Sequence, residues 1–359
     1  MATYIPEALN DPTAYFQAKL YSGNGAAIGA GGNSITFGGE TNLAPGMLWI
    51  KRRDSVAEQN LLDSVRGAQI RYYPDDAYAE DTGVTESVNA FTSDGFNLGN
   101  SGGVNASGGT YVAWCWKAGG SSSSNEAGSI NTTATSVDTT SGFSISTYTG
   151  NDTAGATIGH GLGAVPHLII IKCRNASQSW VVYHHKMRSD PETDYLILDT
   201  NAASVDNANR WNDTAPTSTL ITLGDENQSN GTLNYGAYVF TSIQGYSKFS
   251  SYKGNSNNNG TFVFTGFRPA YVMIKCSTGG SSNWAIFDAK REGYNVDNDA
   301  LYADTNAVEA TSDDIDILSN GFKLRNTGFT LNQGGDTYVY AAFAEAPFVN
   351  SNGVPCNAR

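Results

Sequence analysis

The sequence has no apolar run of the roughly 20 residues that are needed to cross a lipid bilayer. Its first residues, MATYIPEALNDPTAYF, lack both the basic start and the apolar stretch of a secretory signal peptide. We therefore expect a protein that is made in the cytoplasm and does not insert into a membrane.

Basic residues are scarce. The chain has 21 lysines and arginines against 34 aspartates and glutamates, a formal net charge of −13, and no basic stretch. Proteins that bind nucleic acid use lysine and arginine to displace counterions from phosphate. The charge balance therefore argues against nucleic acid as a partner, and equally against an anionic membrane surface.

Cysteine and histidine are also rare. The four cysteines are widely spaced, at Cys115, Cys173, Cys276 and Cys356. A disulfide framework usually has more cysteines in a shorter chain, so we expect buried free thiols. Of the four histidines only His184 and His185 are adjacent, and neighbours on a strand point to opposite faces of the sheet. We therefore predict no metal site.

Familiar catalytic motifs are missing. Neither a GxSxG nucleophile elbow nor a GxxxxGK[ST] phosphate loop occurs, so we predict no catalytic residues, no cofactor and no enzymatic activity. Acidic clusters from Asp75 to Asp81, from Asp297 and from Thr311 leave two alternatives open. A glycoside hydrolase would need two carboxylates that face each other across a cleft, and calcium binds such oxygens. A solvated acidic loop is the simpler interpretation.

The sequence is rich in glycine and tyrosine, with 40 and 19 residues. Short apolar stretches are separated by Gly, Asn and Asp, which favours short strands and tight turns. The periodic runs that are typical of long helices do not occur.

A set of landmarks occurs three times in the same order. The motif YxGN stands at Tyr21, Tyr148 and Tyr252. Each copy continues with an apolar run ending in Ile-Lys (MLWIK, LIIIK, YVMIK) and closes on a tyrosine-rich strand (TYVAWCW, NYGAYVF, TYVYAAF). From the second copy to the third, the first tyrosine moves by 104 residues and the closing tyrosine, Tyr235 to Tyr338, by 103. We interpret this pattern as one unit of about 100 residues present three times.

The predicted fold is all-β, with three tandem antiparallel β-sandwich repeats of the jelly-roll type. The stretch 118–142 consists of Ser, Thr and Gly with almost no apolar residue, which is typical of a flexible linker. The predicted boundaries are an N-terminal docking arm (1–15), a first repeat (16–117), the linker (118–142), a second repeat (143–245), a third repeat (246–348) and a C-terminal tail (349–359).

Residues that recur in the copies are interpreted as structural. The glycine of YxGN is expected in a turn with positive φ. Asp75 or Asp76, with its counterparts Asp199 and Asp304, is expected to cap backbone N–H groups two residues further on. His184 stands where the other copies have aspartate, which indicates a solvent-facing strand end.

The tryptophans divide into two groups. Trp180 and Trp284 are equivalent and each begins a strand, so both are expected in the core. Trp211 lies in the polar stretch NANRWNDTAP and has no counterpart in the other copies. We predict that Trp211 is the exposed platform on which a sugar ring stacks. The alternative is that it anchors its loop to the core.

With these motifs, the chain resembles a repeated domain in virion proteins of tailed bacteriophages, especially marine phages, where it occurs in tail fibres and other structural proteins. The stretches that carry the resemblance are YxGN, WIKRRD, LLDSVRG, SDGFNLG and VNASGGTYVAWCWKAGG in the first copy and GFRPAYVMIK, LSNGFKL and TYVYAAFAEAPF in the last. The resemblance covers residues 16–348 and implies an oligomeric protein of the particle surface, made in the host cytoplasm. It supplies no catalytic residues.

Three functions are considered on this basis. The first is a tail fibre or appendage that contacts a host surface glycan, with other virion proteins and copies of itself as partners, because repeated weak sites gain avidity. The alternative is a capsid decoration protein, and a surface-glycan hydrolase is the third. The N-terminal arm would dock by adding a strand to a neighbouring protein.

Overall fold

A computed structural model of the protein describes residue 9 and residues 11–291, 295 and 297–347. The predicted N-terminal arm lies mostly outside the described residues, and the C-terminal tail lies wholly outside them. The described part is almost entirely β-sheet, and its strands pair antiparallel, which confirms the predicted fold class. It also has one short helix, α1 (Gly102–Asn105), and two 3-10 turns, η1 (Pro12–Ala14) and η2 (Ile28–Ala30). No helix within it is long and apolar enough to span a membrane.

Three large sheets in this part of the chain share one order of strands. The first sheet runs β1 (Phe16–Ser22), β9 (Thr110–Trp116), β3 (Met47–Arg52), β4 (Asn60–Asp63), β5 (Gly67–Tyr72), β6 (Asp81–Thr82). The second runs β10 (Ala134–Asp138), β11 (Phe143–Thr149), β18 (Asn234–Phe240), β13 (Leu168–Cys173), β14 (Val181–His184), β15 (Asp194–Ile197), β16 (Val205–Asp206). The third runs β19 (Ser247–Lys253), β26 (Thr337–Pro347), β21 (Phe267–Cys276), β22 (Ala285–Asp288), β23 (Asp297–Tyr302), β24 (Ala310–Leu318), β25 (Gly321–Leu324), β20 (Phe262–Phe264). In each sheet the opening strand of the copy pairs with its closing strand, and the closing strand pairs with the Ile-Lys strand.

Smaller groups of strands accompany the large sheets. In the first copy these are β2 (Asn33–Thr36), β8 (Gly95–Leu98) and β7 (Val88–Thr92), and in the second they are β12 (Thr157–Gly159) and β17 (Leu220–Thr222). In the third copy β25 and β20 correspond to them and continue the large sheet. The central residues of β2 and β20, Ile35 and Val263, are buried against their own copy's large sheet.

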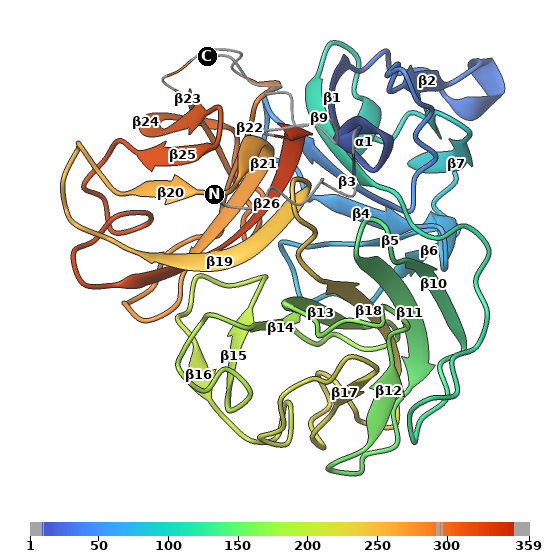
Figure 1. Ribbon diagram of the computed structural model, residues 1–359. Helices are drawn as coiled ribbons and strands as arrows, with labels where there is room; N and C mark the ends of the chain where they lie inside the picture. The colour runs from blue at the N-terminus through green and yellow to red at the C-terminus, as the bar shows by residue number, and fades with distance from the viewer. Residues whose placement is uncertain (1–8, 10, 292–294, 296, 348–359) are drawn as a thin grey trace.

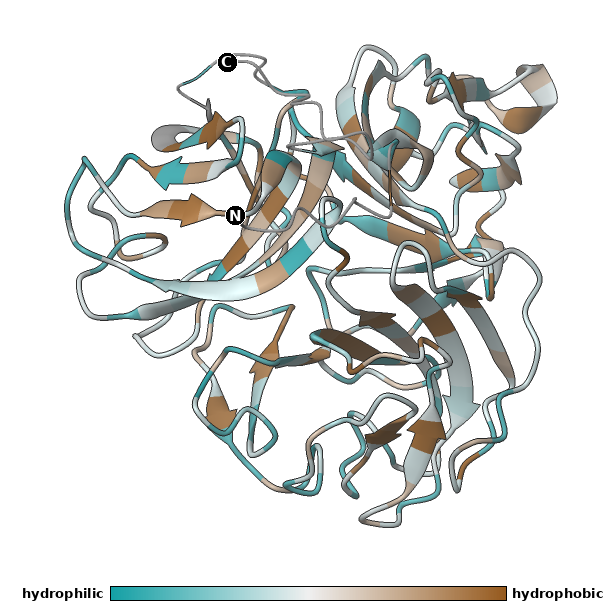
Figure 2. Ribbon diagram, viewed as in Figure 1, coloured by the Kyte–Doolittle hydropathy of each residue, from teal (hydrophilic) through white to brown (hydrophobic). Residues whose placement is uncertain are grey.

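The Ile-Lys strands are buried on both faces, as their unbroken apolar runs predict. In β3, Leu48 and Ile50 pack with the first copy's small strands, whereas Met47 and Trp49 point the other way into a core shared by all three copies. Figure 1 shows the result as three groups of strands arranged around a common centre, and Figure 2 shows hydrophobic segments in the strands of all three groups. The copies are therefore three sectors of one body with a continuous core.

The stretch predicted as a flexible linker is partly built into the second sheet. Residues 134–138 form β10, which pairs with β11 along its whole length, and Thr132 and Thr135 are buried. Thr132 and Thr135 share a hydrogen bond between their hydroxyl groups, and Thr135 shares another with Ser146. Pairs of hydroxyl groups thus fill the buried positions that apolar side chains usually occupy. The prediction of a flexible linker, which depended on the lack of apolar residues, is wrong for residues 134–138.

Candidate functional site

The recurring YxGN motif is a structural clamp in each copy. We call it the Tyr–Asn clamp: the motif's tyrosine and asparagine, the closing tyrosine, and a buried asparagine near it. In the second copy Tyr148 donates its hydroxyl proton to the Ser229 carbonyl and stacks on Tyr235, with ring centroids 5.1 Å apart. Asn230 is fully buried, accepts from the Asn151 N–H at 3.1 Å and donates to the Gly224 carbonyl at 2.7 Å. The clamps of the other copies have the same bonds around Asn105 and Asn332.

The clamp glycine has a different role from the one predicted. Gly23, Gly150 and Gly254 are not among the glycines with positive φ. A Cβ atom at Gly150 would clash with the carbonyl oxygen of Gly231, and the other two copies show the same clash with a facing carbonyl. Glycine is therefore needed because another backbone segment approaches closely, and the positive-φ prediction is wrong.

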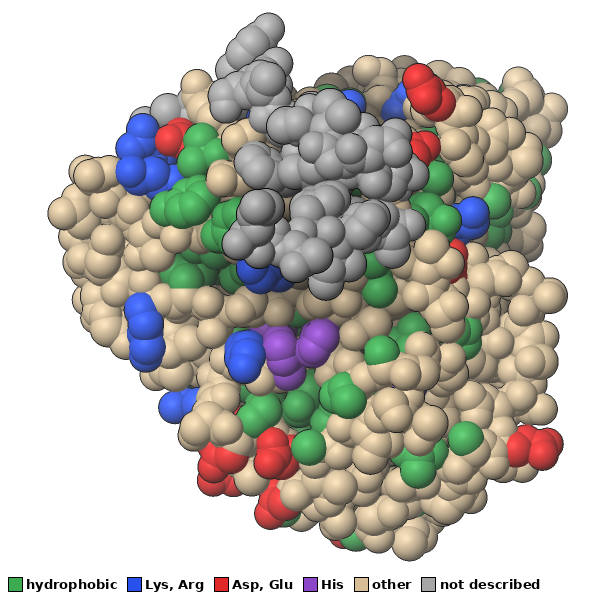
Figure 3. Space-filling model, viewed as in Figure 1, with side chains coloured by type: hydrophobic (Ala, Val, Ile, Leu, Met, Phe, Trp, Pro, Cys, Tyr) green, Lys and Arg blue, Asp and Glu red, His purple; other side chains and the backbone are tan. Residues whose placement is uncertain are grey.

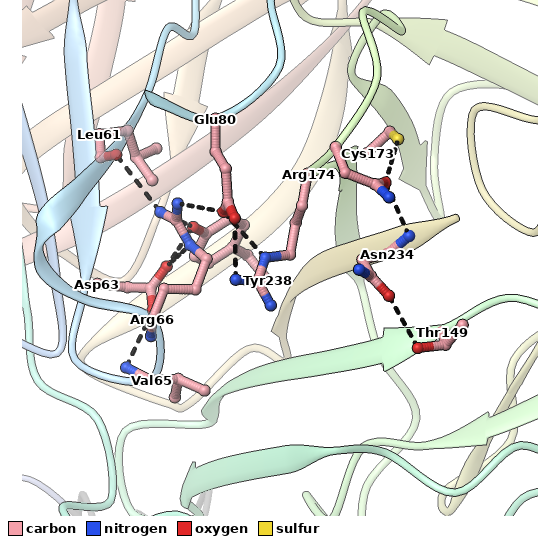
Figure 4. Close-up of polar contacts among 11 residues, drawn as sticks. Leu61, Asp63, Val65, Arg66, Glu80, Thr149, Cys173, Arg174, Asn234 and Tyr238 are labelled. Atoms are coloured by element: carbon pink, nitrogen blue, oxygen red, sulfur yellow. Dashed lines mark hydrogen bonds and ion pairs between the residues drawn. The ribbon is translucent and has the colours of Figure 1, made fainter. Parts of the chain in front are cut away.

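A buried charge cluster joins the first copy to the second (Figure 4). Asp63, at the end of β4, accepts from Arg66 Nε at 2.6 Å and from the Tyr238 hydroxyl of the second copy at 2.6 Å. Glu80 of the first copy accepts from Arg174 of the second copy at 2.9 Å and lies 3.4 Å from Arg66 Nη1. The Arg66 guanidinium also lies 3.6 Å from the centroid of the Tyr72 ring. We call this contact the first junction.

The same cluster recurs where the third copy meets the first, the third junction. Asp288 accepts from Arg291 Nε at 2.7 Å and from Trp114 Nε1 of the first copy at 3.0 Å. Glu309 of the third copy pairs with Arg291 at 2.9 Å and with Arg53 of the first copy at 2.7 Å. The four charged residues of the first cluster thus have counterparts of the same charge, and Trp114 takes the place of the Tyr238 donor.

The second junction, between the second and third copies, keeps the geometry without the buried arginine–carboxylate pair, and a half-exposed arginine, Arg188, donates to the Ser204 hydroxyl at 2.8 Å. His184 and Met187 occupy the positions of the aspartate and arginine, and His184 Nε2 donates to the Tyr340 carbonyl of the third copy at 3.2 Å. Ser204 and Ser277 replace the glutamate and the second arginine. The Ser204 N–H donates to the Ser277 carbonyl at 3.1 Å. Glu80 and Glu309 make the same backbone bond at the other two junctions.

The junction clusters are built to hold the copies together. Asp63, Arg66, Asp288 and Arg291 have side chains that are at most 1% exposed. Burial lowers the pKa of Arg66 and its partner Asp63 raises it, with a raised pKa as the net result, so the guanidinium stays charged. A buried arginine that is permanently charged and fully paired transfers no proton. The clusters therefore stabilise the contacts between copies.

Three equivalent lysines are buried near the junctions; two of them donate across a junction, and Lys275 donates to the Ser282 carbonyl of its own copy. Lys51, Lys172 and Lys275 are fully buried at the ends of the Ile-Lys runs. Lys51 Nζ donates to the Thr305 carbonyl of the third copy at 3.1 Å, and Lys172 Nζ donates to the Ala77 carbonyl of the first copy at 3.0 Å. Burial lowers the pKa of each of the three lysines to about 8.

The recurring aspartates have a structural role that differs from the predicted one. Asp199 and Asp304 accept from the backbone N–H of Trp180 and Trp284 at 2.8 and 2.9 Å, and Asp75 accepts from the N–H of Gln59 in the same way. These partners precede the aspartates by 16 to 20 residues. These three aspartates thus fix the start of a preceding strand, and the prediction of a cap two residues further on is wrong for them. It is confirmed for the alternative residue Asp76, which accepts from the N–H of Tyr78 at 3.2 Å.

Trp211 is buried, which contradicts its predicted role as an exposed sugar platform. Its side chain is 2% exposed, and its Nε1 donates to the Asp194 carbonyl at 3.1 Å. Its ring packs edge-to-face on Tyr183 at 5.8 Å. A loop tryptophan among polar residues can cover the end of a core while its single N–H bonds to a carbonyl, and Trp211 does so. Trp180 and Trp284 are buried as predicted.

The histidines gather beside the second junction. The rings of His167 and His185 are 4.2 Å apart and those of His184 and His185 are 5.4 Å apart, and Figure 3 shows histidine side chains together on one face. His184 is 2% exposed, so its predicted solvent-facing position is wrong. Burial lowers the pKa of His184 to about 3 and that of His185 to about 4. Both rings are therefore neutral at neutral pH.

The other candidate residues offer no assembled centre. Within the described residues, no group of three or more His, Cys, Asp or Glu side chains is arranged to hold a metal ion. Asp81 pairs with Arg71, and Glu80 belongs to the first junction. Cys115, Cys173 and Cys276 are free and buried, as predicted, and Cys356 lies outside the described residues.

Among the surface hollows of the described residues, one lies between the first copy and the segments that follow it, and a smaller one lies on the first copy. The larger, about 640 Å³, lies between residues 44–46, Ser64 and the segments 117–120 and 137–139. The smaller, about 360 Å³, contains Arg52 and Arg71. Both arginines are already paired, with Asp54 and Asp81, so neither hollow presents an unpaired arginine to a ligand.

Sequence reasoning missed the clamp asparagines and the junction arginines. A signal for both was present. Asn105, Asn230 and Asn332 each precede the closing tyrosine by five or six residues. Asp63 and Asp288 are each followed three positions later by an arginine, and this spacing lets the side chain turn back onto its own carboxylate.

Residues 11–347 match the model of a protein family described as a domain of unknown function, DUF7483. The chain belongs to this family. The match is a single span over all three copies, in keeping with the continuous core. Neither a search of curated proteins nor a search of solved structures gave a significant match.

Proposed function

We propose that this DUF7483 protein is a structural component of a tailed-bacteriophage particle, a tail fibre or similar appendage that contacts the host cell surface. Its partners are other virion proteins and further copies of itself. One observation carries the structural part of the proposal: the residues that recur in all three copies hold the fold. The clamps, the buried lysines and the recurring aspartates all bond to backbone groups of the chain itself.

The resemblance to phage structural proteins supports the particle part of the proposal. The acidic composition, with a net charge of −13, suits a protein that must stay soluble until it is assembled. A single body with a continuous core also suits a part that must transmit force without unfolding one copy at a time.

A capsid decoration protein is the second candidate. The observation that favours it is the arrangement of the three copies around a common centre (Figure 1), because a fibre shaft is normally elongated. Such a protein would sit on the head of the particle and stabilise the contacts between capsid subunits.

Locating the chain in purified particles tests both candidates. We expect gold-labelled antibodies against the protein to bind at the tail, and we expect the same antibodies to slow adsorption to host cells. Label over the head, with adsorption unchanged, would favour the decoration protein. Particles that contain no copy of the chain would end both proposals.

A further inference from the structure

A pair of exposed phenylalanines lies on one strand of the third copy. Phe262 and Phe264 on β20 have 45% and 53% of their surface exposed, whereas Val263 between them is buried. Alternation along a strand places both rings on the outer face. Figure 2 shows β20 as a hydrophobic strand at the periphery of the molecule, and β20 is the last strand in the order of its sheet.

Two lysines flank these rings. Lys323 on β25 is the register partner of Phe262, so the two side chains project from the same face. Lys248 on β19 places its Nζ 5.2 Å from the centroid of the Phe264 ring. In Figure 3, hydrophobic side chains lie beside Lys and Arg side chains over β24, β25 and β20. We call Phe262, Phe264, Lys248 and Lys323 the aromatic–basic patch.

The other two copies show that the fold does not need this patch. Strand pairing places Ser34 and Thr36 of the first copy at the positions of the two phenylalanines, because Ile35 pairs with Phe96 as Val263 pairs with Phe322. The same alignment gives Gln17 and Asn97 at the lysine positions. In the second copy the four positions are occupied by Thr157, Gly159, Ser144 and Thr222. Two copies with small or uncharged polar residues fold the same way, so packing does not explain the third.

The chemistry of the patch limits its partner. Exposed rings offer flat apolar faces, on which the C–H face of a pyranose stacks. The ammonium groups of Lys248 and Lys323 each donate to one neutral group, the Phe264 carbonyl and the Asn259 side chain. Their charge is not neutralised by these partners, and their remaining donors can bind a carboxylate or phosphate. The protein as a whole is acidic, with a net charge of −13, so its overall field disfavours a polyanion and the patch lysines supply a local attraction. Two identical patches placed face to face would bring lysines against lysines, which disfavours a symmetric dimer through this surface.

We propose that the aromatic–basic patch of the third copy binds an acidic polysaccharide, with a sugar ring on Phe262 and Phe264 and acidic groups at Lys248 and Lys323. This assignment rests on the proposed contact with the host surface and names the class of ligand. It replaces Trp211 as the glycan-binding element. The site takes one stretch of polymer per chain, because only one copy carries it.

Binding of purified full-length protein to immobilised polymers tests the assignment. The probes are polygalacturonate, hyaluronate and polyglycerol phosphate, with neutral dextran and poly-glutamate as comparisons. We expect binding to at least one acidic glycan polymer, at least tenfold weaker binding in 500 mM than in 50 mM salt, and no binding to dextran. Equal binding to poly-glutamate would show that the partner is an acidic peptide, and absence of binding to all three acidic polymers would refute the assignment.

Variants that borrow residues from the first copy separate binding from folding. Phe262→Ser/Phe264→Thr and Lys248→Gln/Lys323→Asn carry residues that the same fold accepts in the first copy, and circular dichroism should show unchanged spectra. We expect each pair to weaken binding at least tenfold, and the lysine pair to remove most of the salt dependence. Lys253→Ser, which removes an exposed lysine from the same strand, should change binding less than twofold. Full binding by the phenylalanine pair would overturn the proposal.

The outcome is distinguishable from the test of particle location. If the protein is found at the tail but binds no glycan, only the proposed glycan binding by the aromatic–basic patch is refuted. If the protein binds acidic glycans but is missing from particles, the proposed function is refuted and the proposed glycan binding stands.

Discussion

The clamp asparagines show why one side chain type recurs in all three copies. A carboxamide carries a donor and an acceptor on neighbouring atoms. Asn230 uses both on three backbone groups from two segments, Asn151 and Thr153 in one turn and Gly224 in another. Aspartate would lose the donor, and a longer side chain would not fit beside the stacked tyrosines. The asparagine thus satisfies buried backbone groups where the sheet ends and no further strand pairs with them.

Replacement of Asn230 by alanine should destabilise the protein strongly. The substitution leaves one N–H and two carbonyl groups without their partners, and each buried unpaired group costs about 1–3 kcal/mol. We expect the free energy of unfolding to fall by about 3 kcal/mol or more, measured by urea denaturation. Asn234→Ala is the matched control, because Asn234 is an exposed asparagine on β18, and it should cost less than about 0.5 kcal/mol. Equal effects would show that the clamp bonds contribute little.

At the scale of strands and turns, the junctions combine a constant backbone contact with variable side chains. Glu80, Ser204 and Glu309 each donate a backbone N–H to a carbonyl of the next copy. Around this bond two junctions have arginine–carboxylate clusters, while the second junction has His184 and Met187. The second junction shows that the contact geometry does not require a buried arginine–carboxylate pair, because its arginine, Arg188, is half-exposed and bonds to a hydroxyl group. The charges instead make two of the junctions costly to disrupt, since a buried charge without its partner is strongly unfavourable.

Arg291→Met should therefore be more harmful than a change that removes both charges. The single variant leaves the buried Asp288 carboxylate without its guanidinium partner, and we expect a loss of about 3–5 kcal/mol in the free energy of unfolding. The double variant Asp288→Asn/Arg291→Met keeps the acceptor for the Lys290 and Arg291 N–H groups and removes the uncompensated charge. It should recover at least about 1 kcal/mol in the same urea titration. A double variant less stable than the single one would contradict this account of the junction.

Strands were predictable from the sequence, whereas the contacts between copies were not. The runs LIIIK and YVMIK are apolar without interruption, and this pattern alone predicts strands buried on both faces. Arg66 and Tyr238, by contrast, meet across 172 positions of the chain. No local pattern specifies which aromatic residue will face a given arginine. The polar strand β10 was not predicted. Its buried threonines pair through hydroxyl groups, whereas a stretch rich in threonine and poor in apolar residues is typical of a linker.

For the whole molecule, the histidines at the second junction predict a loss of stability in acid. The folded-state pKa of His184, about 3, and that of His185, about 4, lie below the ordinary value of 6.5 because burial disfavours the charged ring, and the neighbouring Lys186 lowers both further. The unfolded chain therefore binds protons first. Their contribution to stability is complete above pH 6.5 and is lost as the pH falls toward 4 and then 3. Asp75, whose pKa burial raises to about 6, acts in the opposite direction between pH 6 and 3.8.

A comparison of variants isolates the histidine contribution from that of the aspartate. We expect wild-type protein to lose more thermal stability between pH 7.5 and pH 4.5 than the His184→Gln/His185→Gln variant does, in scanning calorimetry. The variant should be less stable at pH 7.5, because it loses contacts with Tyr340 and Phe249. Parallel stability curves across this pH range would show that the two rings do not titrate with unfolding.

The surface residues that distinguish one copy from another were the hardest to predict. Trp211 attracted attention because it had no counterpart, yet its ring fills the end of a core. The exposure of Phe262 and Phe264 was not predicted, because the alternation of side chains along a strand does not show which face of the strand is exposed. Only the strand register, which aligns them with Ser34 and Thr36, shows that the third copy departs from the other two.

The closed ring of copies in one polypeptide has a consequence for how the surface can change. In an assembly of three identical chains, any substitution appears at three places at once. Here the three copies are encoded separately within one chain, so a substitution can change the outer face of one copy while the other two copies stay the same. The number of such faces on a larger assembly then equals the number of chains in that assembly, and is not multiplied by the three copies within each chain.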